Sequence, residues 1–173
     1  MENEDFSPVA IMGAGDLKLL RGMIKNYGIL IGSRKWGGST ANSDWDYAFD
    51  NKYTKEIQEL LTRNGVRYDA LYGYEDENGE WKNTMNNVIS MKFIIRNKII
   101  NLITYNSKGM KGFRDVNKCM KALENTPIAE HIGSDKFCRV ALVELLIKKL
   151  VPENGESKSH LQMHIKEQAF NNN

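Results

Sequence analysis

Residues 29–49 read ILIGSRKWGGSTANSDWDYAF. The stretch begins with a short apolar run that stops at Gly32-Ser33, and it resumes with Ser-Asp-Trp-Asp before a second apolar run. Both runs are too short for a buried helix and are typical of buried strands. Because side chains alternate between the two faces of a strand, we expect Asp44 and Asp46 to project from the same face.

Two neighbouring carboxylates repel each other unless a cation compensates their charge. Mg²⁺ suits such a pair, since it binds one or two protein carboxylates together with substrate phosphates. Gly32 allows a ligand to approach the backbone closely, and Ser33 offers a hydroxyl and an N–H group. The stretch therefore predicts a magnesium site at Asp44 and Asp46, beside a phosphate-binding turn at Gly32 and Ser33.

This arrangement resembles the signature of the DNA polymerase beta superfamily of nucleotidyltransferases in a minimal form. The resemblance covers Gly32-Ser33, a spacer of ten residues and Asp44-x-Asp46, and three further residues fit it: Arg34, Gly37 and Ser43. It implies a mixed sheet flanked by helices, a nucleoside triphosphate such as ATP as substrate, and pyrophosphate as leaving group. In that family the two aspartates bind two Mg²⁺ ions.

The resemblance breaks at Asn101. The family usually supplies a third catalytic carboxylate from a later strand, and the matching apolar run here, residues 99–103, holds an asparagine. Asparagine offers a carbonyl oxygen but cannot act as a general base. Three explanations are open: a weakened or inactive relative, another acid such as Asp69 or one within residues 75–80, or an Asp-to-Asn replacement introduced to trap a complex.

Basic residues are candidates for neutralising the triphosphate. Arg34 follows the Gly-Ser turn directly, while Lys136 and Arg139 are spaced i,i+3 near the start of a predicted helix. The resemblance implies that such residues on a C-terminal helix bind the β- and γ-phosphates. The alternative for these cations is a solvated basic edge.

The rest of the chain predicts an α/β (α+β) fold with a mixed sheet and a helical C-terminal part. We expect one compact unit, with a nucleotidyltransferase-like core over residues 1–106 and a helical part over 107–173 packed on it. Hydrophobic periodicity, caps and breakers predict the elements. The predicted helices are 16–26, 53–64, 113–125, 134–151 and 157–170; the predicted strands are 27–31, 45–49, 66–72, 88–95 and 99–105, with a long loop over 73–87.

Composition limits the partner classes only coarsely. The chain has 173 residues, 41% hydrophobic and 27% charged, with a formal net charge of +2. That charge permits an anionic partner without requiring one. An acidic N-terminus, two cysteines and no apolar run of about 20 residues predict a cytoplasmic protein with free thiols and no membrane partner.

The sequence thus favours a Mg²⁺-dependent nucleotidyltransferase that moves a nucleoside monophosphate to an acceptor hydroxyl on a protein, an RNA or a small molecule. A nucleotide-binding pseudoenzyme that senses a ligand or blocks a partner is the rival hypothesis, and Asn101 is the feature that favours it. A purely structural interaction module is a third class, and it predicts no nucleotide affinity.

Overall fold

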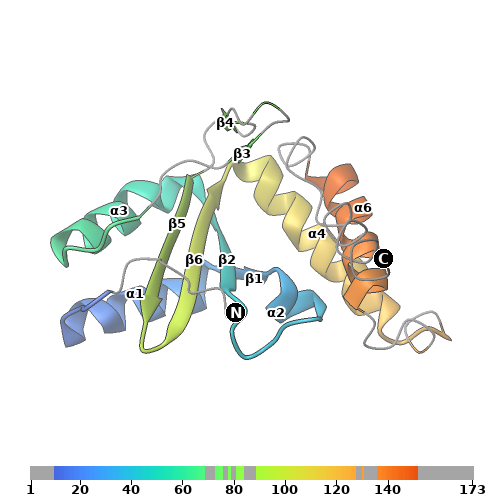
Figure 1. The fold of residues 1–173 in the computed structure, drawn as a ribbon, viewed down its shortest axis with the longest axis horizontal. Coiled ribbons are helices and arrows are strands. Elements are labelled where there is room, and N and C mark those ends of the chain that lie inside the picture. Colours follow the sequence, from blue (N-terminus) through green and yellow to red (C-terminus); the bar gives the residue numbers. More distant parts are fainter. Residues whose placement is uncertain are drawn as a thin grey trace.

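The computed structural model describes residues 10–68, 73–75, 78, 81–83, 89–127, 130 and 136–151. Over this part the chain forms a mixed four-stranded sheet with helices on both faces, so the predicted α+β class is confirmed (Figure 1). No helix in the described part combines the length and the apolar character that crossing a membrane would need.

The sheet has the order β1-β2-β6-β5, and only its central pair is parallel. β1 pairs antiparallel with β2, and β5 pairs antiparallel with β6. The strands are β1 (Ile29–Ile31), β2 (Trp45–Asp50), β5 (Ile89–Ile95) and β6 (Lys98–Tyr105). The parallel pairing of β2 with β6 brings two segments more than fifty residues apart in the sequence side by side.

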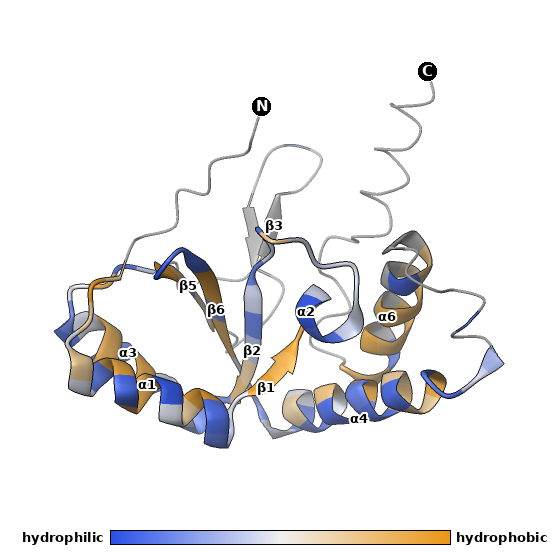
Figure 2. Ribbon diagram, turned by 90° about the horizontal axis from the view of Figure 1, so that it is seen from below, coloured by the Kyte–Doolittle hydropathy of each residue, from blue (hydrophilic) through white to orange (hydrophobic). Residues whose placement is uncertain are grey.

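Each face of the sheet has its own hydrophobic core. Helices α1 (Ala14–Tyr27) and α3 (Thr54–Arg63) cover one face, where Phe49, Phe93 and Leu102 are fully buried. On the other face lie α4 (Ser107–Leu123) and α6 (Lys136–Leu150) (Figure 2). On each central strand, every second residue points to this second face and packs towards α4 and α6, because side chains alternate between the two faces of a strand.

The C-terminal helices share a core with the strands. Phe113 and Val116 of α4 and Val143 of α6 are buried in one cluster with Ala48 and Ile103 of the sheet. α4 is also tied to β1 and to the one-turn helix α2 (Ser33–Trp36) through its residue 117, whose side chain contacts both. Within the described part, the helical residues after 106 therefore pack directly on the strands.

The hairpin between β5 and β6 agrees with its prediction. Arg96 and Asn97 at the turn have φ angles of 49° and 64°, the left-handed conformation of a two-residue type I′ turn. This turn fixes which residues of β5 face which residues of β6. The predicted helix stop at Gly65 also agrees, since Gly65 has a φ of 70° just after α3.

Several predicted boundaries were wrong. The predicted loop over 73–87 contains two short antiparallel strands, β3 (Gly73–Glu75) and β4 (Trp81–Asn83). The return loop after β1 begins with α2, and a 3₁₀ turn, η1 (Asn51–Tyr53), precedes α3. The described part of the predicted strand 66–72 is not a strand, and its residues 69–72, like the predicted cap Ser134 and helix 157–170, lie outside the described residues.

α4 begins six residues earlier than predicted. The Asn106 side chain caps it by accepting a hydrogen bond from the Gly109 N–H at 2.8 Å. Two glycines in its first half weaken the helical pattern. Gly112 is needed for packing, because a Cβ atom there would collide with the Leu150 carbonyl oxygen and would lie 2.8 Å from Val151 Cγ2.

We therefore expect Gly112→Ala to lower the free energy of unfolding by about 1–3 kcal/mol, because the methyl group meets main-chain atoms that cannot move aside. The matched control is Gly22→Ala on α1, where an added Cβ meets no atom within 4 Å. This control should raise stability by about 0.5–1 kcal/mol through helix propensity. Urea unfolding measures both changes, and equal stability gains in the two variants would contradict the packing contact.

Candidate functional site

The candidate site lies where β1 ends against β2, on the face that α4 and α6 share. Register places Ile31 opposite Asp46, and Asp46 in turn beside Asn101 of β6. Gly32 follows Ile31 with a φ of 78°, a conformation that favours glycine. The structure thus brings Gly32, Asp46 and Asn101 together from three separate segments.

The Asp46 carboxylate packs directly on Gly32. A Cβ atom added at Gly32 would overlap Asp46 Oδ2 and would lie 3.2 Å from its carboxyl carbon. The sequence predicted that Gly32 admits a close approach, and the approaching group within the chain is this carboxylate. Any side chain at position 32 would displace it, so the geometry of this turn depends on glycine for both its φ angle and its space.

Burial, and after it the negative charge of Asp44, raise the pKa of Asp46 to about 6. A hydrogen bond from Asn101 and the positive charge of Lys92 act in the opposite direction and are already included in this value. The influence of Asp44 on this pKa shows that the two carboxyl groups lie near each other, as expected for residues on the same face. The pair holds more negative charge than its neighbours compensate.

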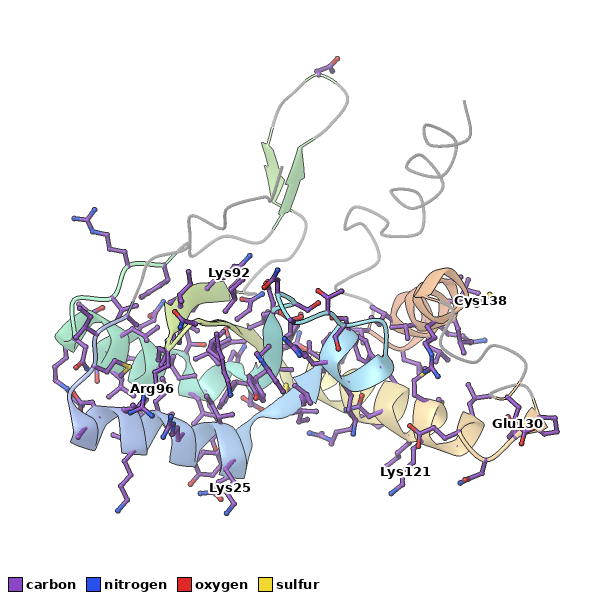
Figure 3. All side chains as sticks on the ribbon, turned by 60° about the horizontal axis from the view of Figure 1, so that its bottom comes forward. Lys25, Lys92, Arg96, Lys121, Glu130 and Cys138 are labelled. Carbon is purple, nitrogen blue, oxygen red and sulfur yellow. The ribbon has the colours of Figure 1, made fainter. Side chains whose placement is uncertain are left out.

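Asp44 stands at the rim of the sheet, just before β2. Its Oδ2 atom is 3.2 Å from Nζ of Lys92, which lies on β5 two strands away from β2 (Figure 3). Both side chains are partly exposed, Lys92 by 36% and Asp44 by 29%. Lys92 was not among the predicted site residues.

Asn101 presents its amide nitrogen, and not its oxygen, to Asp46. The Ser90 hydroxyl on β5 donates a hydrogen bond to Asn101 Oδ1 at 2.7 Å. The other end of the amide, which carries two donors, hydrogen-bonds the Asp46 carboxylate and lowers its pKa. The opposite orientation would point the amide oxygen at a carboxylate. In this arrangement Asn101 positions Asp46, and its oxygen is already engaged.

Ser90 and Lys92 are the residues that sequence reasoning missed. The signal was available: they are two residues apart on the predicted strand 88–95, so they share a face. The type I′ turn pairs Lys92 with Asn101. The sequence does not show that β2 pairs in parallel with β6, and this pairing is what places Asp46 beside Asn101.

Arg34 holds the loop that leads to the two aspartates. Its guanidinium donates hydrogen bonds to the carbonyl oxygens of Ala41 at 3.2 Å and Ser43 at 3.0 Å, and it lies 4.5 Å from the centre of the Trp45 ring. Ser43 closes the same loop, since its hydroxyl accepts a hydrogen bond from the Thr40 N–H at 2.8 Å. These contacts give Arg34 a structural role beside the phosphate contact predicted for it.

Arg139 reaches the same region from α6. Its Nη1 donates a hydrogen bond to the Trp36 carbonyl oxygen at 3.0 Å, and its side chain packs on Gly37, which has a φ of 106°. The structure therefore brings Arg139 to the end of α2, which begins with Ser33. Lys136 is the first residue of α6, but its side chain lies outside the described part.

The residues present fit one hard cation shared with a ligand. Among the described residues, no three His, Cys, Asp or Glu side chains gather into a complete metal site. Two adjacent carboxylates with uncompensated charge match Mg²⁺, which completes its octahedron with water and phosphate oxygens. The half-buried, ionisable Asp46 beside Gly32 is the observation that supports this fit.

The electrostatics predict that Asp46→Asn stabilises the metal-free protein. An aspartate ionises near pH 4 in the unfolded chain and near pH 6 here, so its burial destabilises the fold fully above pH 6 and not at all below pH 4. We expect a gain on the order of 2–3 kcal/mol at pH 8 that disappears towards pH 4. Denaturant unfolding in EDTA at both pH values measures the gain.

Asp115→Asn is the control for this prediction, because Asp115 forms a surface ion pair with the exposed Lys111 one turn earlier on α4. Its effect should stay within about 0.5 kcal/mol at both pH values. A stability gain for Asp46→Asn that is equal at pH 4 and pH 8 would show that burial does not disfavour the ionised carboxylate.

Comparisons with known proteins give no match. No family model matches the chain, and neither a curated protein nor a solved structure matches it. The resemblance to the nucleotidyltransferase signature is therefore one of motifs, and the geometry around Gly32, Asp46 and Asn101 is independent of it.

Proposed function

We propose that this protein is a nucleotidyltransferase, which binds a nucleoside triphosphate with Mg²⁺ at Asp44 and Asp46 and transfers a nucleoside monophosphate to an acceptor hydroxyl. The single observation that carries the proposal is the contact of the Asp46 carboxylate with Gly32. It joins the two halves of the motif, which lie more than ten residues apart in the sequence.

Local explanations account for part of the motif only. Ser43 forms a turn with Thr40, and Arg34 ties down the same loop. Neither contact requires an aspartate at position 44 or 46. A fold that needed only packing at position 46 would be more stable with a neutral side chain, because burial disfavours the ionised carboxylate. A half-buried carboxylate with a raised pKa is typical of a functional site.

The site residues divide into those that bind the metal and those that bind the phosphates. Asp44 and Asp46 hold Mg²⁺, which when bound neutralises charge on the phosphates. Gly32 and Ser33 lie against the triphosphate, which we take to be ATP. Arg139, at the end of α2, and Lys136 on the same helix are the proposed counter-charges for the phosphates that leave. A cytoplasmic location belongs to the same proposal.

The transfer has a simple balance. The acceptor oxygen forms a bond to the α-phosphorus, the bond from that phosphorus to the oxygen bridging the β-phosphorus breaks, and pyrophosphate leaves. The acceptor proton needs a base. Asn101 cannot accept it, because an amide has no basic oxygen and this one already accepts a hydrogen bond from Ser90. Loss of a general base typically lowers a rate about 10²–10⁴-fold.

The presence of Asn101 in place of a carboxylate favours a second candidate function. A protein that keeps the nucleotide site but holds Asn101 as a donor to Asp46 can bind a triphosphate without turning it over. Such a protein would act as a nucleotide sensor or as an inhibitor of a partner. The two functions share the binding site and differ only in transfer.

Triphosphate binding tests what the two functions share. We expect Asp44→Ala to weaken Mg²⁺-dependent binding of a non-hydrolysable ATP analogue at least about tenfold, a loss of about 1.4 kcal/mol, because one of the two metal-binding carboxylates is gone. Isothermal titration calorimetry with and without Mg²⁺ measures it, with Asp115→Ala as control. Equal affinities in wild type and Asp44→Ala would exclude the proposed metal site.

Label transfer separates the two functions. Incubation of wild type and Asn101→Asp with radiolabelled ATP, Mg²⁺ and cell extract should label an acceptor more strongly in the variant, because a carboxylate restores a base at that position. Labelling only by the variant indicates a disabled enzyme, and equal labelling by both indicates that another base serves. If neither transfers label although both bind the nucleotide, the sensor or inhibitor function holds.

A further inference from the structure

We propose that the ammonium group of Lys92 takes the place of one divalent cation, so that this site binds a single Mg²⁺ with its triphosphate. The inference rests on the proposed function and specifies its metal content. It follows from the position of Lys92, from the charges around it and from the orientation of Asn101, each of which is independent of the motif that suggested the function.

The position of Lys92 is fixed by the sheet. Lys92 of β5 is in register with Asn101 of β6, and Asn101 is in register with Asp46 of β2. The three residues therefore form one row on one face, across three strands about 4.8 Å apart. A lysine side chain is long enough to pass over the short asparagine, and Nζ ends 3.2 Å from Asp44 Oδ2.

The charges leave room for one divalent ion. The row and its neighbour contain two carboxylates, one ammonium and one neutral amide, which together carry one negative charge. Among these described side chains, a single divalent cation already outweighs the one negative charge that remains. A second divalent cation on the β5 side would stand next to the ammonium group and would be repelled by it.

The oxygen ligands point to the same conclusion. On the β6 side of the aspartates, the Asn101 oxygen already accepts a hydrogen bond from Ser90, and its amide nitrogen faces Asp46. An amide nitrogen that donates to a carboxylate does not bind Mg²⁺, which takes oxygen ligands. Among the described residues, therefore, the β5–β6 side of the row offers a cation and donors where a second metal would need oxygen atoms.

The alternative is that Lys92 and Asp44 form an ordinary ion pair at the rim, with no role towards a metal. Exposed pairs of this kind contribute little to stability. The two hypotheses differ in what a carboxylate at position 101 does while Lys92 is still present. If Lys92 stands in for a cation, Asn101→Asp alone still binds one ion, and a second site forms only when the charge of Lys92 is removed as well. If Lys92 is an ordinary rim pair, Asn101→Asp alone creates the second site.

Electron paramagnetic resonance with Mn²⁺ in place of Mg²⁺, and one equivalent of a non-hydrolysable ATP analogue, tests the inference. Two neighbouring Mn²⁺ ions give a spin-coupled spectrum, so ions held elsewhere on the nucleotide do not confuse the count. We expect one uncoupled Mn²⁺ per chain in wild type and in Asn101→Asp. The Lys92→Met/Asn101→Asp double variant should bind two coupled ions, and Lys98→Met, which removes an exposed lysine beside Trp45, should behave as wild type.

Titration of Mn²⁺ alone provides a second measurement. Lys92→Met should bind the first ion at least about tenfold more tightly than wild type, because Asp44 is released from its ammonium partner, while Lys92→Arg should retain the weaker affinity. A coupled pair of ions in wild type or in Asn101→Asp, or a single ion in a folded double variant, overturns the inference and leaves the proposed function intact. Absence of any Mn²⁺ binding with nucleotide overturns both.

Discussion

The contact between the Asp46 carboxylate and Gly32 constrains the rest of this structure. It requires a residue without a Cβ atom at the end of β1, and it requires β1 and β2 to be paired in one register. On its other side Asp46 takes a hydrogen bond from Asn101, which the parallel pairing of β2 with β6 places beside it. Three strands thus converge on one ionisable group, and a shift of one residue in either pairing would remove it from the site.

The surrounding contacts serve to hold this group and its neighbour in place. The Arg34 side chain holds the loop before Asp44 by hydrogen bonds to main-chain carbonyl oxygens. The Arg139 side chain, from α6, donates a hydrogen bond to the last residue of α2. Since each arginine has five donors, a guanidinium can hold backbone carbonyls and still offer donors to an anion. A structural role for these cations is therefore compatible with a role towards phosphate, and it places both at the same loop.

The sequence predicted the parts of the fold that local chemistry decides. The β5–β6 hairpin followed from two β-rich runs around an Arg-Asn turn, and the stop of α3 followed from Gly65. The start of α4 did not, because Gly112 reads as a helix breaker until its contact with Leu150 is known. For the same reason the site was predicted at Gly32, Ser33 and the two aspartates, whereas Lys92 and Ser90 depend on a register that only long-range pairing sets.

Stability and charge together argue that position 46 is kept for a ligand. Burial and the charge of Asp44 both disfavour the ionised form of Asp46, and the amide of Asn101 with the ammonium of Lys92 offsets this only in part. A neutral asparagine beside Asp46 is the less repulsive choice in the absence of a second cation, and Lys92 on Asp44 acts in the same direction. The described side chains of the site thus keep one net negative charge, which a single divalent ion would offset at the carboxylates.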